Sequence, residues 1–508
     1  MGLVEDRDKI STGVTYQYIS TIIGIFEGFL FYLFLVHFFS TEIVGAIALL
    51  SAILALFSTI FSLGLGAGVQ HFISYYIGQN DVKAVKQIVI KLSKIAVLIS
   101  IIAFAFIWIT ATEFVTLFFH SLKYTIFMQL LAFVILSNVM NQVIYNILLG
   151  LQNFKANAIR SIISNTLAYG SIVPLLIINN NPLMIVVGWN IGYFTGTILT
   201  FLFLFKKMKY IESRPAPYIK IKPIIYYSIP LFISGLIGYG ATYVDRFIVS
   251  YFLNLSEMGI YNFSLLIVNA LSILIMPFGA ILLPKLSEYY GKREYDKMRL
   301  LGSKAIEVLM AVYMPIALLV AAISQPILLF IANREYLPGY IPIITILVIN
   351  SIFISSNILG VTLQAIRKTR IFLLSSSLAL ASNFVLSVIL IPRFGIDGAG
   401  IAFSSIYIMG FAVVFYYAKK YHTVTFEKLK LAKIFMSGFL MFFIIFLVQE
   451  HFGYSILKLI VYIIAGFAIY IVLIRITKTF KNEDLDLFLM LLSDRYVKIK
   501  TLIRKILV

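Results

Sequence analysis

Three ionisable side chains lie inside apolar stretches of the sequence, where charge is costly. Glu27 falls about halfway along the stretch 14–39, and Asp245 and Arg246 fall in the second half of the stretch 224–253. A charge within hydrocarbon costs several kcal/mol and usually faces a cavity or a partner. The carboxylates could therefore bind a proton or a cation, and the guanidinium could bind phosphate. The alternative is that these residues form ion pairs that hold helices together.

The two carboxylates share helical faces with small and polar residues. On a helix, positions three and four apart lie on one side. Adjacent Asp245 and Arg246 point about 100° apart, so the two cannot both lie at the centre of one face. The residues on the two faces are Ser20, Gly24, Glu27 and Gly28, and Ser234, Gly238, Thr242 and Asp245.

Two further stretches carry uncharged polar faces. In 124–150 the spacing i, i+3, i+4, i+7 and i+8 is occupied by Asn138, Asn141, Gln142, Tyr145 and Asn146. In 341–363 the polar residues are Asn350, Ser351, Ser355, Ser356 and Asn357. Amides and hydroxyls can bind sugar hydroxyls without net charge, but they also hold transmembrane helices together. Both interpretations stay open, and the candidate substrate-path residues are Asn138, Asn141, Gln142 and Asn350, with Glu27, Asp245 and Arg246.

Other chemistries find no support in the sequence. There is no cysteine, no pair of histidines at metal-ligand spacing, no phosphate-binding loop and no nucleophile motif. We therefore expect no catalytic residue, no metal and no cofactor. Transport would then use a gradient of H+, of Na+ or of the substrate itself.

The composition indicates the environment in which these residues lie. The 508 residues are 61% hydrophobic and 12% charged, and the mean hydropathy is +0.98. Soluble domains are about 45–50% apolar and about 25% charged. The composition excludes a soluble enzyme and predicts an all-α polytopic membrane protein.

Fourteen stretches reach the roughly 20 apolar residues that a transmembrane helix needs. They are 14–39, 43–77, 95–112, 124–150, 159–178, 183–205, 224–253, 258–283, 305–331, 341–363, 371–391, 398–417, 432–449 and 456–474.

Positive charge predicts the orientation of these spans. The net charge is +19, with 41 Lys and Arg residues. If both termini are cytoplasmic, every Lys and Arg falls in a cytoplasmic segment except five. Lys123, Arg334, Arg393 and Lys458 lie outside, and Arg246 lies within a span. This bias follows the positive-inside rule, so the basic excess requires no nucleic-acid partner. We expect a multi-pass protein of the plasma membrane.

Short matches at a nearly constant offset predict an internal duplication. Lys206-Lys207 recurs as Lys419-Lys420, and Leu151-Gln152 recurs as Leu363-Gln364. Six spans per unit make the two repeats parallel, an arrangement that places a substrate path where repeats meet. The predicted parts are an N-terminal six-helix repeat (1–210), a cytoplasmic linker (211–223), a C-terminal six-helix repeat (224–417), a transmembrane helix pair (418–481) and a basic amphipathic helix on the cytoplasmic leaflet (482–508).

Two motifs resemble those of a known family. One is Asp245-Arg246 followed by Glu257-Met258-Gly259-Ile260-Tyr261, and the other runs from Ile391-Pro392 to Gly398-Ala399-Gly400. Both are similar to patterns of the polysaccharide transporter family of the MOP exporter superfamily. The resemblance implies an inverted-V bundle of 14 helices, not an enzyme. It further implies a flippase that carries a polyprenyl- or dolichyl-phosphate-linked oligosaccharide to the external leaflet by alternating access, for polysaccharide export or protein glycosylation.

Two other functions compete with this one. A multidrug or small-molecule exporter of the same superfamily would use the same fold with ion coupling. A membrane glycosyltransferase or polymerase would need catalytic acids in a sizeable external loop, and loops such as 179–182 are too short.

Overall fold

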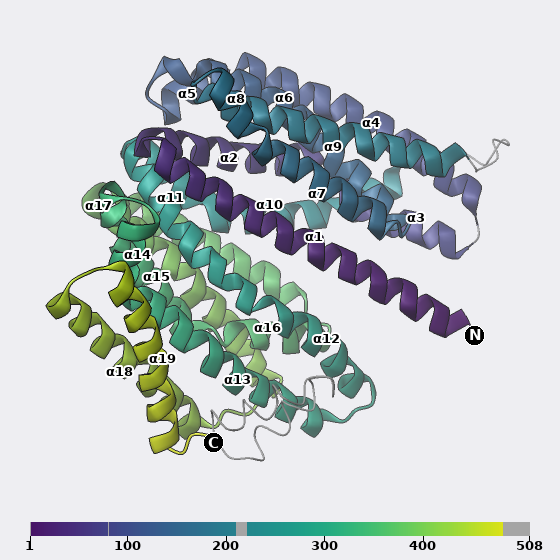
Figure 1. Ribbon diagram of the computed structural model, residues 1–508. Coiled ribbons are helices and arrows are strands. Elements are labelled where there is room, and N and C mark those ends of the chain that lie inside the picture. The colour runs from purple at the N-terminus through teal and green to yellow at the C-terminus, as the bar shows by residue number, and fades with distance from the viewer. Residues whose placement is uncertain (1, 80, 210–220, 481–508) are drawn as a thin grey trace. The chain divides into compact units, whose positions relative to one another are not determined.

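The computed structural model describes residues 2–79, 81–209 and 221–480, which within these ranges form helices and no strand (Figure 1). Most of the predicted linker 211–223 and all of the predicted amphipathic helix 482–508 lie outside the described residues. Packing divides the chain into two compact units, Met1–Gly259 and Ile260–Val508.

The first unit is a bundle of long helices. Its elements are α1 (Gly2–Phe38), α2 (Thr41–Ser62), α3 (Leu65–Gly78), α4 (Val82–Ile109), α5 (Ala111–Phe118), η1 (Leu122–Tyr124), α6 (Thr125–Gly150), α7 (Phe154–Gly170), α8 (Ile172–Ile178), α9 (Leu183–Lys209), α10 (Lys222–Phe252) and the beginning of α11 (Leu255–Ala270). α6 packs against α4 and α9, and α7 packs against α1 and α9 (Figure 1). α10 packs against α2 and α3.

The second unit is also helical. After the rest of α11 it contains η2 (Leu271–Leu274), α12 (Met276–Gly291), α13 (Tyr295–Ala322), α14 (Ser324–Ile331), η3 (Arg334–Gly339), α15 (Tyr340–Phe353), α16 (Ser356–Ala365), α17 (Arg370–Lys420), α18 (Lys428–Phe452) and α19 (Ile456–Ile476). α13 contacts both α15 and α18, so this helix of the predicted C-terminal repeat packs against the predicted C-terminal helix pair.

Thirteen helical stretches of the described chain are long and apolar enough to cross a membrane, compared with the 14 predicted. The difference is α17, which contains the predicted spans 371–391 and 398–417. A straight helix of its 51 residues would be about 76 Å long. Gly395 instead has φ 56° and ψ −139°, outside the helical region. Ser405 Oγ donates a hydrogen bond to Ser382 Oγ at 3.0 Å, so the chain turns back on itself, and the number of crossings stays a prediction.

Several stretches that the sequence predicts as single continuous helices are interrupted in the structure. Each of five predicted single spans consists of successive helices, because the apolar pattern continues through the residues where one helix ends and the next begins. These spans are 43–77, 159–178, 258–283, 305–331 and 341–363. The third span was expected to begin at residue 95, but α4 begins at Val82, where the Asp81 side chain accepts a hydrogen bond from the backbone N–H of Ala84.

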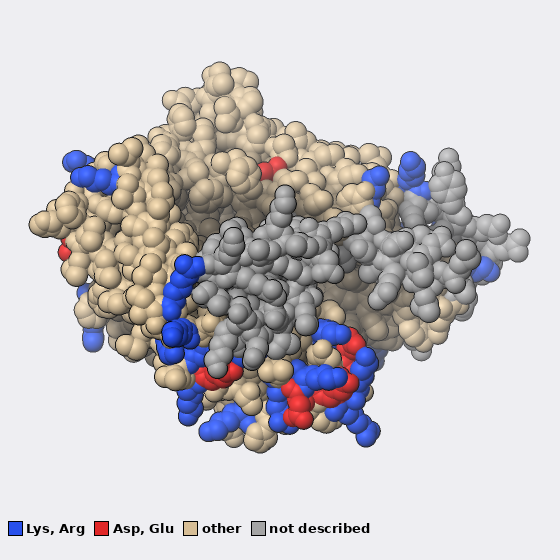
Figure 2. Space-filling model, turned by 60° about the horizontal axis from the view of Figure 1, so that its bottom comes forward, with Lys and Arg blue, Asp and Glu red and all other residues tan. Residues whose placement is uncertain are grey.

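The surface fits a hydrocarbon environment. Large apolar side chains are exposed along α19, among them Ile456, Leu457, Ile460 and Ile464. A soluble protein rarely exposes such a continuous apolar face. Figure 2 shows acidic and basic side chains gathered in clusters toward the end of the molecule where α12 and α13 meet, while most of the other described surface in this view is uncharged.

The beginning of α11 touches α2 through bare backbone. A Cβ atom added to Gly45 would lie 1.7 Å from the carbonyl oxygen of Leu255, and one added to Gly259 would lie 2.2 Å from that of Thr41. Only glycine at these positions permits so close an approach.

A buried cluster of charges joins α18 to α13. The Nζ of Lys430 lies 2.7 Å from Oε2 of Glu307, and the Nζ of Lys304 lies 3.2 Å from the same oxygen. The Glu307 side chain is 3% exposed, whereas Glu427, which pairs with Lys304 at 2.6 Å, is 56% exposed. Removing one partner from such a buried group of charges strongly destabilises a protein.

Glu307→Gln should therefore destabilise the protein by about 3–5 kcal/mol, because it removes a buried carboxylate that pairs with both Lys304 and Lys430. Glu427→Gln removes a carboxylate from the same cluster at an exposed position and should cost about 1 kcal/mol or less. Thermal unfolding in detergent measures both changes. Equal stability of the two variants would contradict a supporting role for Glu307.

Candidate functional site

A polar cavity of about 270 Å³ lies within the first unit, between α6, α7 and α9. Nearly all of its lining side chains can form hydrogen bonds, and none is a carboxylate. The lining residues are Asn138, Asn141, Gln142, Tyr145, Arg160, Ser161, Ser164, Asn165 and Tyr193. The cavity thus brings together the three amides that the sequence predicted on one helix face, and adds a guanidinium.

The turn between α6 and α7 explains why these residues meet. α6 ends at Gly150 and α7 begins at Phe154, so the two helices form a tight helical hairpin. The Asn153 side chain starts α7 by accepting a hydrogen bond from the backbone N–H of Ala156. Tyr145 lies five residues before the end of α6, and Arg160 lies six residues after the start of α7. The last turns of one helix therefore lie level with the first turns of the other.

Asn141 is fully engaged in helix packing. Its Nδ2 donates to Thr197 Oγ1 at 2.8 Å and to the Tyr193 carbonyl at 3.2 Å, and its Oδ1 accepts from Thr200 at 3.2 Å. Ser164 likewise donates to the Gly192 carbonyl at 2.9 Å. For Asn141 these bonds favour the packing interpretation that the sequence left open.

Arg160, unlike Asn141 and Ser164, is not held by hydrogen bonds to neighbouring helices in the described part of the chain. Its guanidinium lies over the ring of Tyr145, with 5.4 Å between Cζ and the ring centroid. Its buried Nε has no hydrogen-bond partner among the described residues. No described carboxylate pairs with it. A half-buried cation that is held by an aromatic face and lines a polar cavity is available to an anionic ligand.

Glu27 lies next to the cavity without lining it. Its Oε1 accepts a hydrogen bond from Thr166 on α7, while its buried Oε2 has no described hydrogen-bond partner. Gly24 touches α7 nearby, since a Cβ there would lie 3.1 Å from Nδ2 of the cavity residue Asn165. Thr166 follows Arg160 by six residues, about 9 Å along the helix axis, so Glu27 and Arg160 occupy different places.

Asp245 and Arg246 are buried on α10 and do not line this cavity. Arg246 Nη1 donates to the Thr242 carbonyl at 3.1 Å, and its Cζ lies 4.2 Å from the ring centroid of Tyr243. Arg246 is thus held in part by its own helix, while its Nε, like that of Arg160, has no hydrogen-bond partner among the described residues. The geometry of this residue is compatible with a packing role as well as with the predicted contact to a substrate.

A cavity also lies within the second unit, lined by residues of η2, α12, α15, α16 and α17. It has a volume of about 390 Å³ and is lined by Asn350, Asn357 and Tyr407, among others. Asn350 and Asn357 follow Asn138 and Tyr145 by the same interval of 212 residues. Asn350 donates to the Tyr313 hydroxyl at 3.0 Å. No arginine lines this second cavity, and none of its lining residues corresponds by this interval to the α7 residues that line the first.

The sequence analysis missed Arg160, because a basic residue so near the start of a span was assigned to the cytoplasmic segment. A signal was nevertheless present. Asn157, Arg160, Ser161, Ser164 and Asn165 repeat the spacing i, i+3, i+4, i+7 and i+8 seen on the preceding span. Two facing polar stripes on neighbouring helices would have predicted the cavity.

Comparison with known proteins identifies relatives. The family described as polysaccharide biosynthesis protein matches residues 10–290, more than half of the chain. An uncharacterized membrane protein of Methanocaldococcus jannaschii is 31% identical over 33% of this chain and 34% of its own length. A probable low-salt glycan biosynthesis flippase, Agl15, of Haloferax volcanii is 21% identical over 46% of this chain and 49% of its own length. The chain therefore spans only about a third of the length of the first relative and about half of the length of the second.

Two solved structures share the fold. The lipid II flippase MurJ in an inward closed conformation has a TM-score of 0.71 and 17% identity, over 91% of this chain and 97% of that one. An inward-facing multidrug resistance MATE family transporter of the MOP superfamily has a TM-score of 0.66 and 13% identity, over 80% of this chain and 97% of that one. The predicted all-helical membrane fold of the MOP type is confirmed.

The two amides of one helix face should respond differently to substitution. Asn141→Ala removes bonds between α6 and α9 and should destabilise the protein by about 0.6–2 kcal/mol. Gln142→Ala, the adjacent exposed position, should leave stability unchanged within about 0.5 kcal/mol. Thermal unfolding in detergent would distinguish them, and an equal loss in both variants would argue against a packing role specific to Asn141.

Proposed function

The chain belongs to the polysaccharide biosynthesis protein family of membrane transporters, and on this premise we propose that it flips a lipid-linked oligosaccharide across the membrane. The substrate class is a polyprenyl or dolichyl chain that carries a glycan through one or two phosphates. The direction is from the cytoplasmic to the external leaflet, by alternating access of the predicted repeats 1–210 and 224–417.

The observation that carries this proposal is the Arg160 guanidinium, whose buried Nε has no described hydrogen-bond partner, in an otherwise uncharged polar cavity. A phosphate cannot enter hydrocarbon alone, because an unpaired ion is very costly there. Guanidinium binds phosphate through two parallel hydrogen bonds. A carboxylate in the cavity would neutralise Arg160, and the described lining contains none.

The remaining lining fits the sugar next to the phosphate. Asn138 and Gln142 have amide groups that donate and accept, as sugar hydroxyls require. Tyr193 offers an aromatic side chain on the third helix. The volume of about 270 Å³ limits what the cavity can hold to the phosphate and the nearest part of the glycan.

The proposed orientation places this cavity toward the cytoplasm. With both termini inside, the last turns of α6 and the first turns of α7 lie in the cytoplasmic half of the plasma membrane. A lipid-linked glycan made in the cytoplasm would reach Arg160 from that side. The excess of Lys and Arg in the predicted cytoplasmic segments supports this orientation.

Arg160→Gln should lower the rate of flipping about 10–100-fold, because it removes a charged hydrogen-bond donor worth about 1.5–3 kcal/mol. Arg160→Lys keeps the charge without the paired donors and should be intermediate. The measurement is translocation of a lipid-linked oligosaccharide by the full chain in proteoliposomes. Arg299→Gln, which removes a positive charge far along the chain and outside the cavity, is the control. Wild-type flipping by Arg160→Gln at unchanged stability would refute the assignment.

We propose that Glu27 couples transport to H+ or Na+, since one of its oxygens has no described partner. Glu27→Gln should then abolish stimulation of flipping by an imposed gradient while leaving the rate without a gradient. Glu113→Gln, on α5, is a matched control. A response to H+ and Na+ gradients identical to that of the wild type would exclude Glu27 from coupling.

A further inference from the structure

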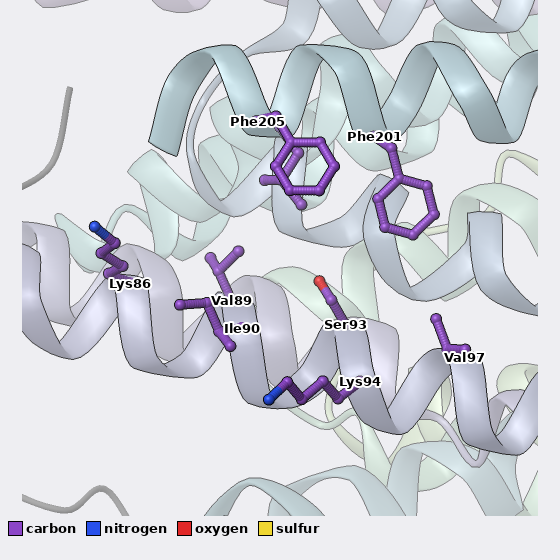
Figure 3. Close-up of a pocket in the computed structure, with 9 residues that line it drawn as sticks. Lys86, Val89, Ile90, Ser93, Lys94, Val97, Phe201 and Phe205 are labelled. Atoms are coloured by element: carbon purple, nitrogen blue, oxygen red, sulfur yellow. The ribbon is translucent and has the colours of Figure 1, made fainter. Parts of the chain in front are cut away.

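A groove of about 770 Å³ runs between α4 and α9, separate from the polar cavity. Its walls are mostly aliphatic and aromatic side chains, namely Val89, Ile90, Val97, Phe201, Leu204 and Phe205. Figure 3 shows Phe201 and Phe205 of α9 projecting toward the side chains of α4. The volume is within the range of about 300–1,000 Å³ typical of ligand sites.

The charged residues of the groove are two lysines. Lys86 and Lys94 line it, and Figure 3 shows both ammonium groups directed toward the beginning of α4. Lysines with apolar stems extend in this way toward the polar boundary of a membrane. Neither α4 nor α9 contains an Asp or Glu. Lys86 and Lys94 therefore place positive charge at the end of the groove where α4 begins, beside the Asp81 carboxylate that caps this helix, and the remainder of the groove is apolar.

A hydroxyl lies between the charged and apolar ends. Ser93 projects into the groove (Figure 3), and its Oγ has no hydrogen-bond partner among the described residues. It offers a donor to an oxygen of a ligand that lies along α4.

The length of the groove matches one leaflet. Lys86 and Val97 are eleven residues apart, which is about 16 Å along a helix. Half of a hydrocarbon core of about 30 Å is about 15 Å. A transmembrane helix of a partner protein would extend through both leaflets, whereas a single lipid occupies only this length.

We infer that the α4–α9 groove is a binding site for an anionic membrane lipid, whose phosphate pairs with Lys86 and Lys94 and whose hydrocarbon chain lies against Phe201 and Phe205. The leaflet is the one at the beginning of α4, which is cytoplasmic in the proposed orientation. This site is distinct from the Arg160 cavity and does not depend on the identity of the transported substrate.

Native mass spectrometry of the full chain in detergent, titrated with phosphatidylglycerol and with phosphatidylcholine, tests the inference. The wild type should bind phosphatidylglycerol at least fivefold more tightly. The double variant Lys86→Gln/Lys94→Gln should lose this preference. The double variant Lys83→Gln/Lys91→Gln removes the same charge from α4 outside the groove and should bind within twofold of the wild type. Ser93→Trp should weaken binding of both lipids by filling the groove.

Three outcomes would overturn the inference. Equal losses in the two lysine double variants would indicate diffuse attraction of anionic lipid to α4. Undiminished binding in both Lys86→Gln/Lys94→Gln and Ser93→Trp would place the lipid elsewhere. A dimer that dissociates on Ser93→Trp would show that a second copy of the chain occupies the groove. Measured melting temperatures separate these results from misfolding.

Discussion

Inside hydrocarbon, every polar group must find its partner within the protein, and this constraint decides how the polar residues of the chain are interpreted. Asn141 and Ser164 satisfy it through neighbouring helices, so they need no ligand. Glu307 satisfies it through Lys304 and Lys430. Arg160 has an aromatic neighbour but no described hydrogen-bond partner for Nε. Arg246 Nε likewise has no described partner, but Arg160 lines the polar cavity and is therefore the candidate for contact with a ligand.

The two cavities differ both in the helices that line them and in charge. Asn138 and Tyr145 line the first cavity, and Asn350 and Asn357, each 212 residues later, line the second. Arg160 lines the first cavity, whereas no arginine lines the second. Under the predicted duplication, a phosphate would therefore distinguish one repeat from the other.

The helices could be predicted from the sequence because each spans a long apolar run, and the turn near Gly395 because Pro392 and glycines interrupt one. The internal breaks could not be predicted, since the residues between α11 and α12 remain apolar through Leu271–Leu274. Three cavity amides could be predicted from their spacing on one helix. The polar residues of α7 have the same spacing, but placing them opposite α6 required knowledge of which helices are neighbours, and that depends on a tight turn whose geometry the apolar pattern does not encode.

The contact of Gly45 with Gly259 has a mechanical consequence. Helices usually meet through interlocked side chains, and separating them requires several rotamers to change together. At these two positions, carbonyl oxygens lie where side chains would otherwise be. No rotamer at either glycine has to change when the start of α11 moves relative to α2, whereas a single added methyl group would push the two helices apart.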